Sequence, residues 1–558
     1  MSVIPSPGRE NKLMRGVMIL TPATLLAKII GLFYKIPLLA IVGVGGMAYF
    51  LAAYHVYSLL FVLCAAGLPT ALSLLVSHRV ARGEGGAVSR IFGVALAAFL
   101  ALGAVLAAVM VLFAPQIAAL LAMPEAARSL IAIAPALFLS AFTGAVRGLF
   151  QGHHIMLPSA LCEVLEAASK LIFGILLASM ARARGLDTPT VAAAAILGIT
   201  LGTVLSALSL LLWLICCRRR LFVSGAACSL QKRHALSAVV RVALPVTCSA
   251  AVMGLVTLVD TALISARLQA VGFAPAVANL LYSSYGNLAV PLYNLVPALL
   301  TPVTLSLVPI LSAALAKGDQ QAAQAAFGGA ARLIALVTLP AVCGLALFSE
   351  PVLGLLFFGQ GEAVRIAAPL LSVLAPALLP TALIALTSAA LQAAGKTAFP
   401  VYSMLIGASV KLLLEAFLLG VPQVGIFGAP LSTLACNLVV LLLNTAALSR
   451  VATYRLFTPG AFLRPLLAAL SASLLGGALY RFLILKLGYA VWQVPLLILF
   501  VGLLYAPLAL LLGAVERDDL IDLPCGKLLC RVLDRCHLSH KENKNDKRRK
   551  IAADIGQK

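Results

Sequence analysis

Apolar segments recur from one end of the chain to the other, most of them about 20 residues long, the length an α-helix needs to cross a hydrocarbon core of roughly 30 Å. Of the 558 residues, 62% are hydrophobic and only 11% are charged, against roughly 25% charged residues in ordinary globular proteins. A transmembrane β-barrel needs short segments of alternating polarity instead. The sequence therefore predicts an all-α polytopic membrane protein.

Charged residues, glycines and prolines divide these segments into about fourteen predicted transmembrane helices. The second and the eighth are long and contain prolines, so we expect tilted or broken helices there. The predicted spans cover residues 16–42, 47–78, 89–113, 127–149, 156–180, 190–217, 236–265, 278–312, 323–348, 363–391, 398–420, 425–448, 461–486 and 490–515.

The basic residues of the connecting segments predict the orientation. They cluster at residues 9–15, 79–90, 218–233 and 450–455, all on one side of an even-numbered topology. By the positive-inside rule we place both termini in the cytoplasm, with Arg182 and Arg184 as a minor exception. The predicted location is the cell membrane, which the chain crosses many times.

The net charge of +22 includes the basic tail "KENKNDKRRK" at residues 541–550, which suits an anionic membrane leaflet better than nucleic acid. We therefore expect membrane lipids, and no nucleic acid, as partners. The same tail contains a Cys and His cluster whose gaps do not match the usual C-x2-C zinc spacing. A basic amphipathic helix is favoured over a metal site for this cluster, which consists of Cys525, Cys530, Cys536, His537 and His540.

Two parts of the chain repeat each other. Residues 147–174 resemble residues 391–418, and Gln151 to Lys170 has the same spacing as Gln392 to Lys411. Because the offset spans an even number of helices, the repeats are parallel in topology. We predict two lobes of about six helices each at residues 1–230 and 231–450, an additional helix pair at 451–515, and a basic cytoplasmic tail at 516–558.

Parallel repeated lobes are typical of transporters that bind substrate between the lobes and expose it alternately to each side. The sequence contains no G-x-x-x-x-G-K-[ST] motif, so an ATP-driven pump is not favoured and no cofactor is expected. The open energy sources are a gradient of Na+ or H+, the membrane potential, or the gradient of the substrate.

The first predicted span contains Lys28 and Lys35 but no carboxylate. The two lysines are seven residues apart, which places them about 20° apart around a helix and about 10 Å apart along it. Gly31 lies between them on the same face and leaves room for a bulky group. Both amines can snorkel to the membrane surfaces, but a cavity-lining role is favoured because a charge at the bilayer centre is expensive. Cations in a cavity favour an anionic substrate such as a phosphate or pyrophosphate over a cationic drug.

Further charged residues lie in the fifth and eleventh predicted spans. Glu163 and Glu166 share the fifth span with Lys170, and Lys411 and Glu415 lie in the eleventh. The i,i+4 pairs Glu166/Lys170 and Lys411/Glu415 can neutralise each other, so a structural role and a role in gating or coupling both remain open.

The seventh and eighth predicted spans carry polar groups as well. Asp260 and Arg267 are seven residues apart and can pair or gate. His55, in the second span, is predicted to be a hydrogen-bonded interior residue rather than a proton relay. Polar groups at membrane depth are tolerated where they line water or substrate, although plain packing is an equal alternative for them. In the eighth span these groups are Tyr285, Asn287 and Asn294.

Several segments together resemble one family. These are "AKIIGLFYKIPLL", "AAGLPTALSLLVS", "RGLFQG", "LPVTCSAAVMGLVTLVDTALISARL" and "LVPILSAALAKGD". They are similar to the stage V sporulation protein B branch of the polysaccharide exporters, within the multidrug/oligosaccharidyl-lipid/polysaccharide (MOP) flippase superfamily that includes the MurJ lipid II flippases. The resemblance covers roughly residues 13–450 in order.

The resemblance implies movement of an undecaprenyl-pyrophosphate-linked cell-wall precursor from the inner to the outer leaflet, with spore-cortex synthesis as a suggested setting. Family members usually have arginine in the first helix where this chain has Lys28 and Lys35. Lysine keeps the charge but lacks the bidentate fork that arginine offers to phosphate. The last two spans would form a groove for the polyprenyl tail.

The sequence therefore predicts a non-enzymatic flippase that acts as a monomer on a lipid-linked glycan, with wall-synthesis enzymes as potential partners. The alternatives are an exporter of another polysaccharide unit, a multidrug/cation antiporter, or a non-transporting scaffold. Lys28, Lys35 and Arg267 are the predicted pyrophosphate ligands, with Gly31 among the cavity-lining residues. The predicted gating or coupling residues are Glu166, Lys170, Asp260, Lys411 and Glu415.

Overall fold

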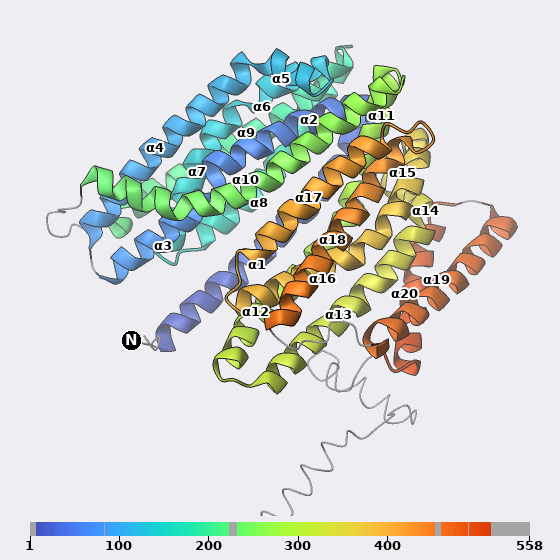
Figure 1. Cartoon of the computed structure of the whole chain (residues 1–558). Coiled ribbons are helices and arrows are strands. Elements are labelled where there is room, and N and C mark those ends of the chain that lie inside the picture. Colours follow the sequence, from blue (N-terminus) through green and yellow to red (C-terminus); the bar gives the residue numbers. More distant parts are fainter. Residues whose placement is uncertain (1–6, 83, 223–230, 452–458, 489, 515–558) are drawn as a thin grey trace, which may run out of the picture. The chain divides into compact units, whose positions relative to one another are not determined.

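The computed structural model describes residues 7–82, 84–222, 231–451, 459–488 and 490–514. Within these ranges the chain consists of helices joined by short turns and contains no strand (Figure 1). The predicted all-α class is confirmed. Helix ends often coincide with glycines in the left-handed region, such as Gly43 (φ 81°) after α1 and Gly272 (φ 103°) after α10.

The helices fall into two compact units. Unit 1 contains the described residues up to Pro291 together with Leu356–Ala367 and Lys411–Ser432. Its helices are α1 (Pro7–Val42), α2 (Val44–Phe61), α3 (Gly67–Ala81), α4 (Gly85–Leu112), α5 (Ala114–Leu120), α6 (Ala127–Ile133), α7 (Pro135–Gly152), α8 (Leu157–Ala183), α9 (Thr188–Leu221), α10 (Lys232–Ala270) and α11 (Pro275–Ser283). Helix α15 (Gly361–Leu374) belongs to unit 1 up to Ala367 and to unit 2 from Ala368.

Unit 2 contains Leu292–Leu355, Ala368–Val410 and the described residues from Thr433 onwards. Helix α17 (Phe399–Leu418) changes from unit 2 to unit 1 at Lys411. The remaining helices, some of which also begin in unit 1, are α12 (Val290–Ala316), α13 (Gln320–Leu347), α14 (Ser349–Leu356), α16 (Leu378–Ala393), α18 (Gly428–Val451), α19 (Pro459–Leu487) and α20 (Gln493–Leu511).

Two predicted spans are interrupted by π-helical turns. Val62–Ala66 (η1) separates α2 from α3, and Ser284–Ala289 (η3) separates α11 from α12. Each turn lies just before a proline, Pro69 or Pro291, which has no N–H to continue the α-helical hydrogen-bond ladder. The eighth span is also bent by 40° between Pro275–Thr301 and Ser306–Ala316. The expectation of a broken helix is confirmed for the eighth span, whereas the second continues through its π-helical turn as one segment, Val44–Val80.

In the described part of the chain, 12 helical segments are long and apolar enough to cross a membrane, or up to 13 with the bent pair counted as one span. These segments correspond to thirteen of the predicted spans. The seventh predicted span, residues 236–265, lies inside the continuous 39-residue helix α10, which is not among those segments. The count of fourteen therefore stays a prediction.

Unit 1 is held together by close helix packing. Helix α8 packs along α9 and α1, and α10 packs on α2, α3 and α4 (Figure 1). A Cβ added to Gly198 would lie 2.4 Å from the Gly174 backbone, so only glycine permits this approach of α9 to α8. Buried apolar side chains such as Leu72, Ile91 and Phe150 fill the space between α3, α4 and α7.

Unit 2 has a separate framework, in which α13 packs against α16 and α19, and α19 packs against α20 (Figure 1). The Tyr505 hydroxyl of α20 donates to the Leu336 carbonyl oxygen of α13 at 2.9 Å. The amide of Asn437 donates to the Tyr293 hydroxyl at 3.1 Å and to the Thr381 hydroxyl at 2.8 Å. The units are defined by contacts and the predicted lobes by repeated sequence, so the domain bounds 1–230, 231–450, 451–515 and 516–558 stay predictions. The Cys and His cluster of residues 525–540 lies outside the described residues.

Candidate transport site

Helix α1 brings two lysines into one membrane-spanning segment, Pro22–Val42. Lys35 is half-buried, whereas the side chain of Lys28 lies outside the described part of the structure. A Cβ added to Gly31 would meet no atom within 4 Å, so space is present beside the helix at this point. The charge of Lys35 lies within electrostatic range of the His55 ring.

His55, on α2, is a hydrogen-bonded interior residue, as the sequence predicted. Its Nδ1 is 2.7 Å from the Thr261 hydroxyl of α10 and 3.3 Å from the Tyr282 hydroxyl of α11. The charged groups of Lys35, Asp260 and Lys411 all act on the ring. His55 therefore links α2 to α10 and α11.

A buried cluster of Asp260, Lys411 and Glu415 joins α10 to α17. The Lys411 ammonium donates to Asp260 Oδ1 at 2.6 Å and lies 4.0 Å from Glu415 Oε2. The Glu415 side chain is completely buried, and neither of its oxygens accepts a hydrogen bond. The predicted i,i+4 pair of Lys411 and Glu415 is present, but the shorter contact of Lys411 is with Asp260 on another helix.

A second charged cluster centres on Arg147 of α7, which the sequence analysis missed. Its guanidinium lies 3.1 Å from Glu166 Oε2 and 3.7 Å from Glu163 Oε1, both on α8. The Thr24 hydroxyl of α1 donates to Glu163 Oε2 at 2.7 Å. Glu166 therefore pairs with Arg147 rather than with Lys170, which makes no ion pair with any described residue.

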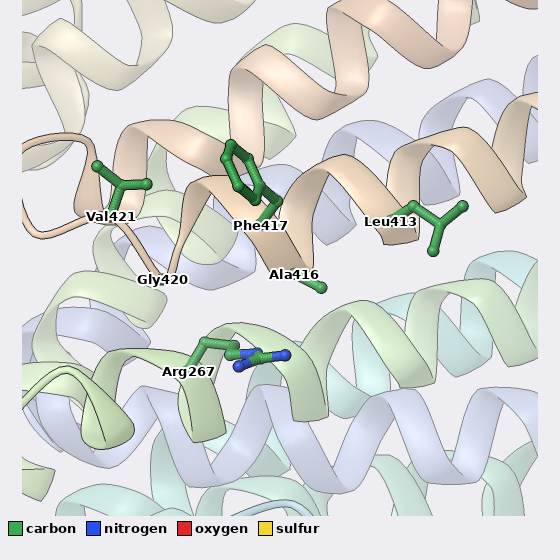
Figure 2. Close-up of a pocket in the computed structure, with 6 residues that line it drawn as sticks. All are labelled: Arg267, Leu413, Ala416, Phe417, Gly420 and Val421. Carbon is green, nitrogen blue, oxygen red and sulfur yellow. The ribbon is translucent and has the colours of Figure 1, made fainter.

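Arg267, in the last turn of α10, lines an open pocket of about 470 Å³. The other lining residues come from α17 and the turn after it, and are Leu413, Ala416, Phe417, Gly420 and Val421. Figure 2 shows the Arg267 side chain extending between α10 and α17, with Ala416 across from it. Its guanidinium is exposed and forms no ion pair in the described part of the chain. Of the two open roles, pairing of Asp260 with Arg267 does not occur, because Asp260 pairs with Lys411, and a role in gating stays a prediction.

The predicted cavity-lining residues of the eighth span differ in position. Tyr285 and Asn287 lie in the π-helical turn η3 of unit 1, and both are buried. The Asn287 amide donates to the Met47 carbonyl oxygen at 3.2 Å and to the Ser283 hydroxyl at 3.0 Å. Tyr285 lies within electrostatic range of Lys411. Asn294 belongs to unit 2 and is exposed, so it is not part of this buried cluster.

An ion pair at the ends of two spans connects Asp187, in the loop after α8, to Arg128 at the start of α6. The Arg128 guanidinium donates to Asp187 and to the Thr190 hydroxyl. The Thr190 hydroxyl and, to a smaller extent, Arg128 hold the pKa of Asp187 below its ordinary value. Both side chains of this pair are more than half exposed, at 58% and 54%. No group of three or more His, Cys, Asp or Glu side chains suited to a metal ion occurs in the described residues.

The fold is shared with solved membrane transporters of the MOP superfamily. A solved structure of the lipid II flippase MurJ in an inward closed conformation matches 88% of this chain and 98% of its own, with a TM-score of 0.67 and 16% identity. An inward-facing multidrug resistance MATE transporter of the MOP superfamily matches 78% of this chain and 98% of its own, with a TM-score of 0.62 and 16% identity. At these identities the likeness shows a shared fold.

The family follows from the sequence. A family model described as lipid II flippase MurJ matches residues 40–501, and the chain belongs to this family. Stage V sporulation protein B of Bacillus subtilis (strain 168) is 25% identical over 448 residues, which cover 79% of this chain and 84% of that protein. Lipid II flippase MurJ of the same organism is 25% identical over 471 residues, covering 80% and 84%. The predicted resemblance is confirmed, and these families are transporters rather than enzymes.

Proposed function

We propose that this chain is a flippase that moves an undecaprenyl-pyrophosphate-linked peptidoglycan precursor, similar to lipid II, from the inner to the outer leaflet. The observation that carries the proposal is a half-buried lysine, Lys35, inside a membrane span that contains no carboxylate. A cation at that depth is expensive unless it meets a negative charge. Membership of the lipid II flippase family makes a lipid pyrophosphate the natural partner of that charge.

Lys28, Lys35 and Arg267 are the proposed ligands of the pyrophosphate. Ammonium and guanidinium groups form charge-assisted hydrogen bonds with phosphate oxygens, and the exposed guanidinium of Arg267 in its open pocket is accessible to such a group. Space beside Gly31 leaves room for a bulky head group. Tyr285, Asn287 and Asn294 are proposed to line the path.

The proposed cycle is alternating access, in which the path opens to each side of the membrane in turn. Glu166, Lys170, Asp260, Lys411 and Glu415 are proposed gating or coupling residues. An ion gradient or the membrane potential supplies the energy, without a cofactor. Both termini are proposed to lie in the cytoplasm. The chain is proposed to act as a monomer beside wall-synthesis enzymes. Similarity to stage V sporulation protein B supports a role in spore-cortex synthesis.

The test is translocation of fluorescent lipid II in proteoliposomes, with wild type compared with Lys28→Ala, Lys28→Arg and Lys35→Ala. We expect wild type to move lipid II, the alanine variants to lose movement and Lys28→Arg to restore it. Lys317→Ala is the matched control, because Lys317 is exposed in the turn between α12 and α13. Normal movement by both alanine variants would contradict the proposed role of the lysines.

The same assay separates the alternative functions. If correctly folded wild type leaves lipid II in place but moves another polyprenyl-linked glycan, the substrate assignment is wrong and the flippase class holds. Transport of a cationic dye against a gradient would favour the multidrug/cation antiporter, whose fold the MATE transporter shares. A scaffold would move none of these, and its role in cells would tolerate the Lys28 substitution.

A further inference from the structure

Glu415 is the only charged side chain among the described residues that is completely buried. Neither of its oxygens accepts a hydrogen bond from a described donor, and the group within hydrogen-bond reach of it is another carboxylate, that of Asp260. The nearest cation, Lys411, lies 4.0 Å away and already donates to Asp260 at 2.6 Å. Burial of a charged carboxylate in such a place costs its full desolvation free energy, whereas a neutral carboxylic acid avoids most of this cost.

The groups around Glu415 do not supply a second positive charge at close range. Asp260 faces it from α10 and Lys411 from its own helix, α17. Tyr285 of η3 acts on Lys411, and Tyr282 of α11 and His55 of α2 act on Asp260. Lys35 of α1 acts on His55 rather than on the carboxylates. Two carboxylates thus share one ammonium, and the cluster is neutral only when one of them holds a proton.

We propose that Glu415 binds and releases the proton that couples transport to the proton gradient, while Lys411 remains a permanent cation shared with Asp260. This role rests on the proposed flippase function for what is transported. The proton comes from water and returns to water, and no other bond is made or broken. The Lys411 contacts, 2.6 Å to Asp260 and 4.0 Å to Glu415, are those expected when Glu415 holds the proton.

Release of the proton changes the forces between the two helices. Glu415 then becomes a second carboxylate that competes for Lys411, one helical turn away on α17. The contact from Lys411 to Asp260 weakens, and it is this contact that joins α17 to α10. The charge of one buried side chain therefore controls the attachment of one helix to another.

A metal ion fits this cluster less well than a proton. An ammonium already lies between the two carboxylates, and it repels a second cation at this distance. The described residues offer no group of three or more His, Cys, Asp or Glu side chains suited to a metal. Na+ dependence is accordingly not expected.

The first test needs no substrate. Infrared difference spectra of the purified full-length chain are recorded during a pH titration, for wild type, Glu415→Gln and the control Glu362→Gln, in which an exposed carboxylate is replaced. We expect a carboxylic-acid carbonyl band that titrates in wild type and in the control and is lost in Glu415→Gln. Glutamine has the shape of the neutral acid, so this variant should fold. An unchanged titrating band in Glu415→Gln would overturn the proposal.

The second test measures transport in proteoliposomes with a pH gradient, the membrane potential clamped and Na+ either absent or present. Wild type should respond to the pH gradient without Na+, and Glu415→Gln should lose that response completely. A wild type that requires Na+ and ignores the pH gradient overturns the proton assignment. If no lipid II moves at all, the flippase proposal fails, while the infrared result still decides whether Glu415 holds a proton.

Discussion

Two clusters in unit 1 contain the same charges, one cation and two carboxylates, in very different surroundings. Around Arg147, the side chains of Glu163 and Glu166 are 27% and 29% exposed, and each has a polar partner. Around Lys411, Asp260 is 17% exposed and Glu415 is fully buried without a hydrogen bond. The first cluster can remain charged because both carboxylates are partly exposed and both face the guanidinium. The second cannot do so without a proton or a rearrangement.

The two clusters also lie on repeated helices. Lys170 of α8 occupies the position in the sequence repeat that Lys411 occupies in α17. In the first copy Arg147 of α7 pairs with both carboxylates, and Lys170 pairs with neither. In the second copy Lys411 is the central cation. The contacts of the first cluster join α7, α8 and α1, and in the proposed cycle it is the second cluster that changes state.

Lys411→Met should produce the largest effect on this comparison. Removal of one partner from a buried ion pair leaves an uncompensated charge, and we expect a loss of about 3–5 kcal/mol in the free energy of unfolding. Denaturant titration of the purified protein in detergent measures it. The double variant Asp260→Asn/Lys411→Met should recover part of the loss, because it removes the orphaned charge. A loss below about 1 kcal/mol would place this pair with ordinary surface ion pairs.

Arg147→Met should have a smaller effect of the same sign. It leaves Glu163 and Glu166 without their cation, but both stay partly exposed and Glu163 keeps the Thr24 hydroxyl. We expect a loss of about 1.5–3 kcal/mol, the range for hydrogen bonds to charged groups, in the same denaturant titration. Glu166→Gln is the control, because Arg147 then retains Glu163. A loss larger than that of Lys411→Met would reverse the comparison of the two clusters.

The sequence predicted the helices well but did not predict which charged side chains form ion pairs. Apolar length and prolines predicted the helices and the interruptions at η1 and η3, because both effects act within one segment. The i,i+4 rule found Lys411 beside Glu415 but also offered Lys170 as a partner of Glu166, since it considers a single helix. The true partners come from elsewhere in the chain, and Asp260 is 151 residues from Lys411. Only packing of the helices brings these residues together.

Arg147 shows the same limit from another side. It lies in the segment "RGLFQG", one of those that carry the family resemblance, and near the end of a predicted span, where basic residues are common. Two glutamates one helix further on were the available signal, because carboxylates inside a span require a cation. The complete burial of Glu415 had no such signal, as it depends on how neighbouring helices cover α17.

Lys170→Met tests whether the repeated lysines are equivalent. Lys170 forms no ion pair with described residues, so we expect a change within about 0.5 kcal/mol in the free energy of unfolding. The measurement is the one used for Lys411→Met, and that variant is its matched counterpart in the repeat. Losses of similar size in the two variants would mean that Lys170 neutralises the carboxylates of α8 and that the clusters are alike.

Asp187→Asn should have the smallest effect and the plainest pH dependence. Asp187 lies outside the spans, and the Thr190 hydroxyl and then Arg128 hold its pKa below its ordinary value. A lowered pKa in the folded state stabilises the protein above the unfolded pKa of about 3.9, and the stabilisation is lost as the pH falls through the folded-state value. The Tm of wild type should therefore slightly exceed that of the variant at neutral pH and converge with it in acid. High salt should shrink the difference at neutral pH, because both side chains are exposed to solvent. A difference that persists in acid would show that Asp187 acts through its shape and hydrogen bonds rather than its charge. A loss of stability larger than that of Arg147→Met would show that burial does not explain the contrast between the two buried clusters.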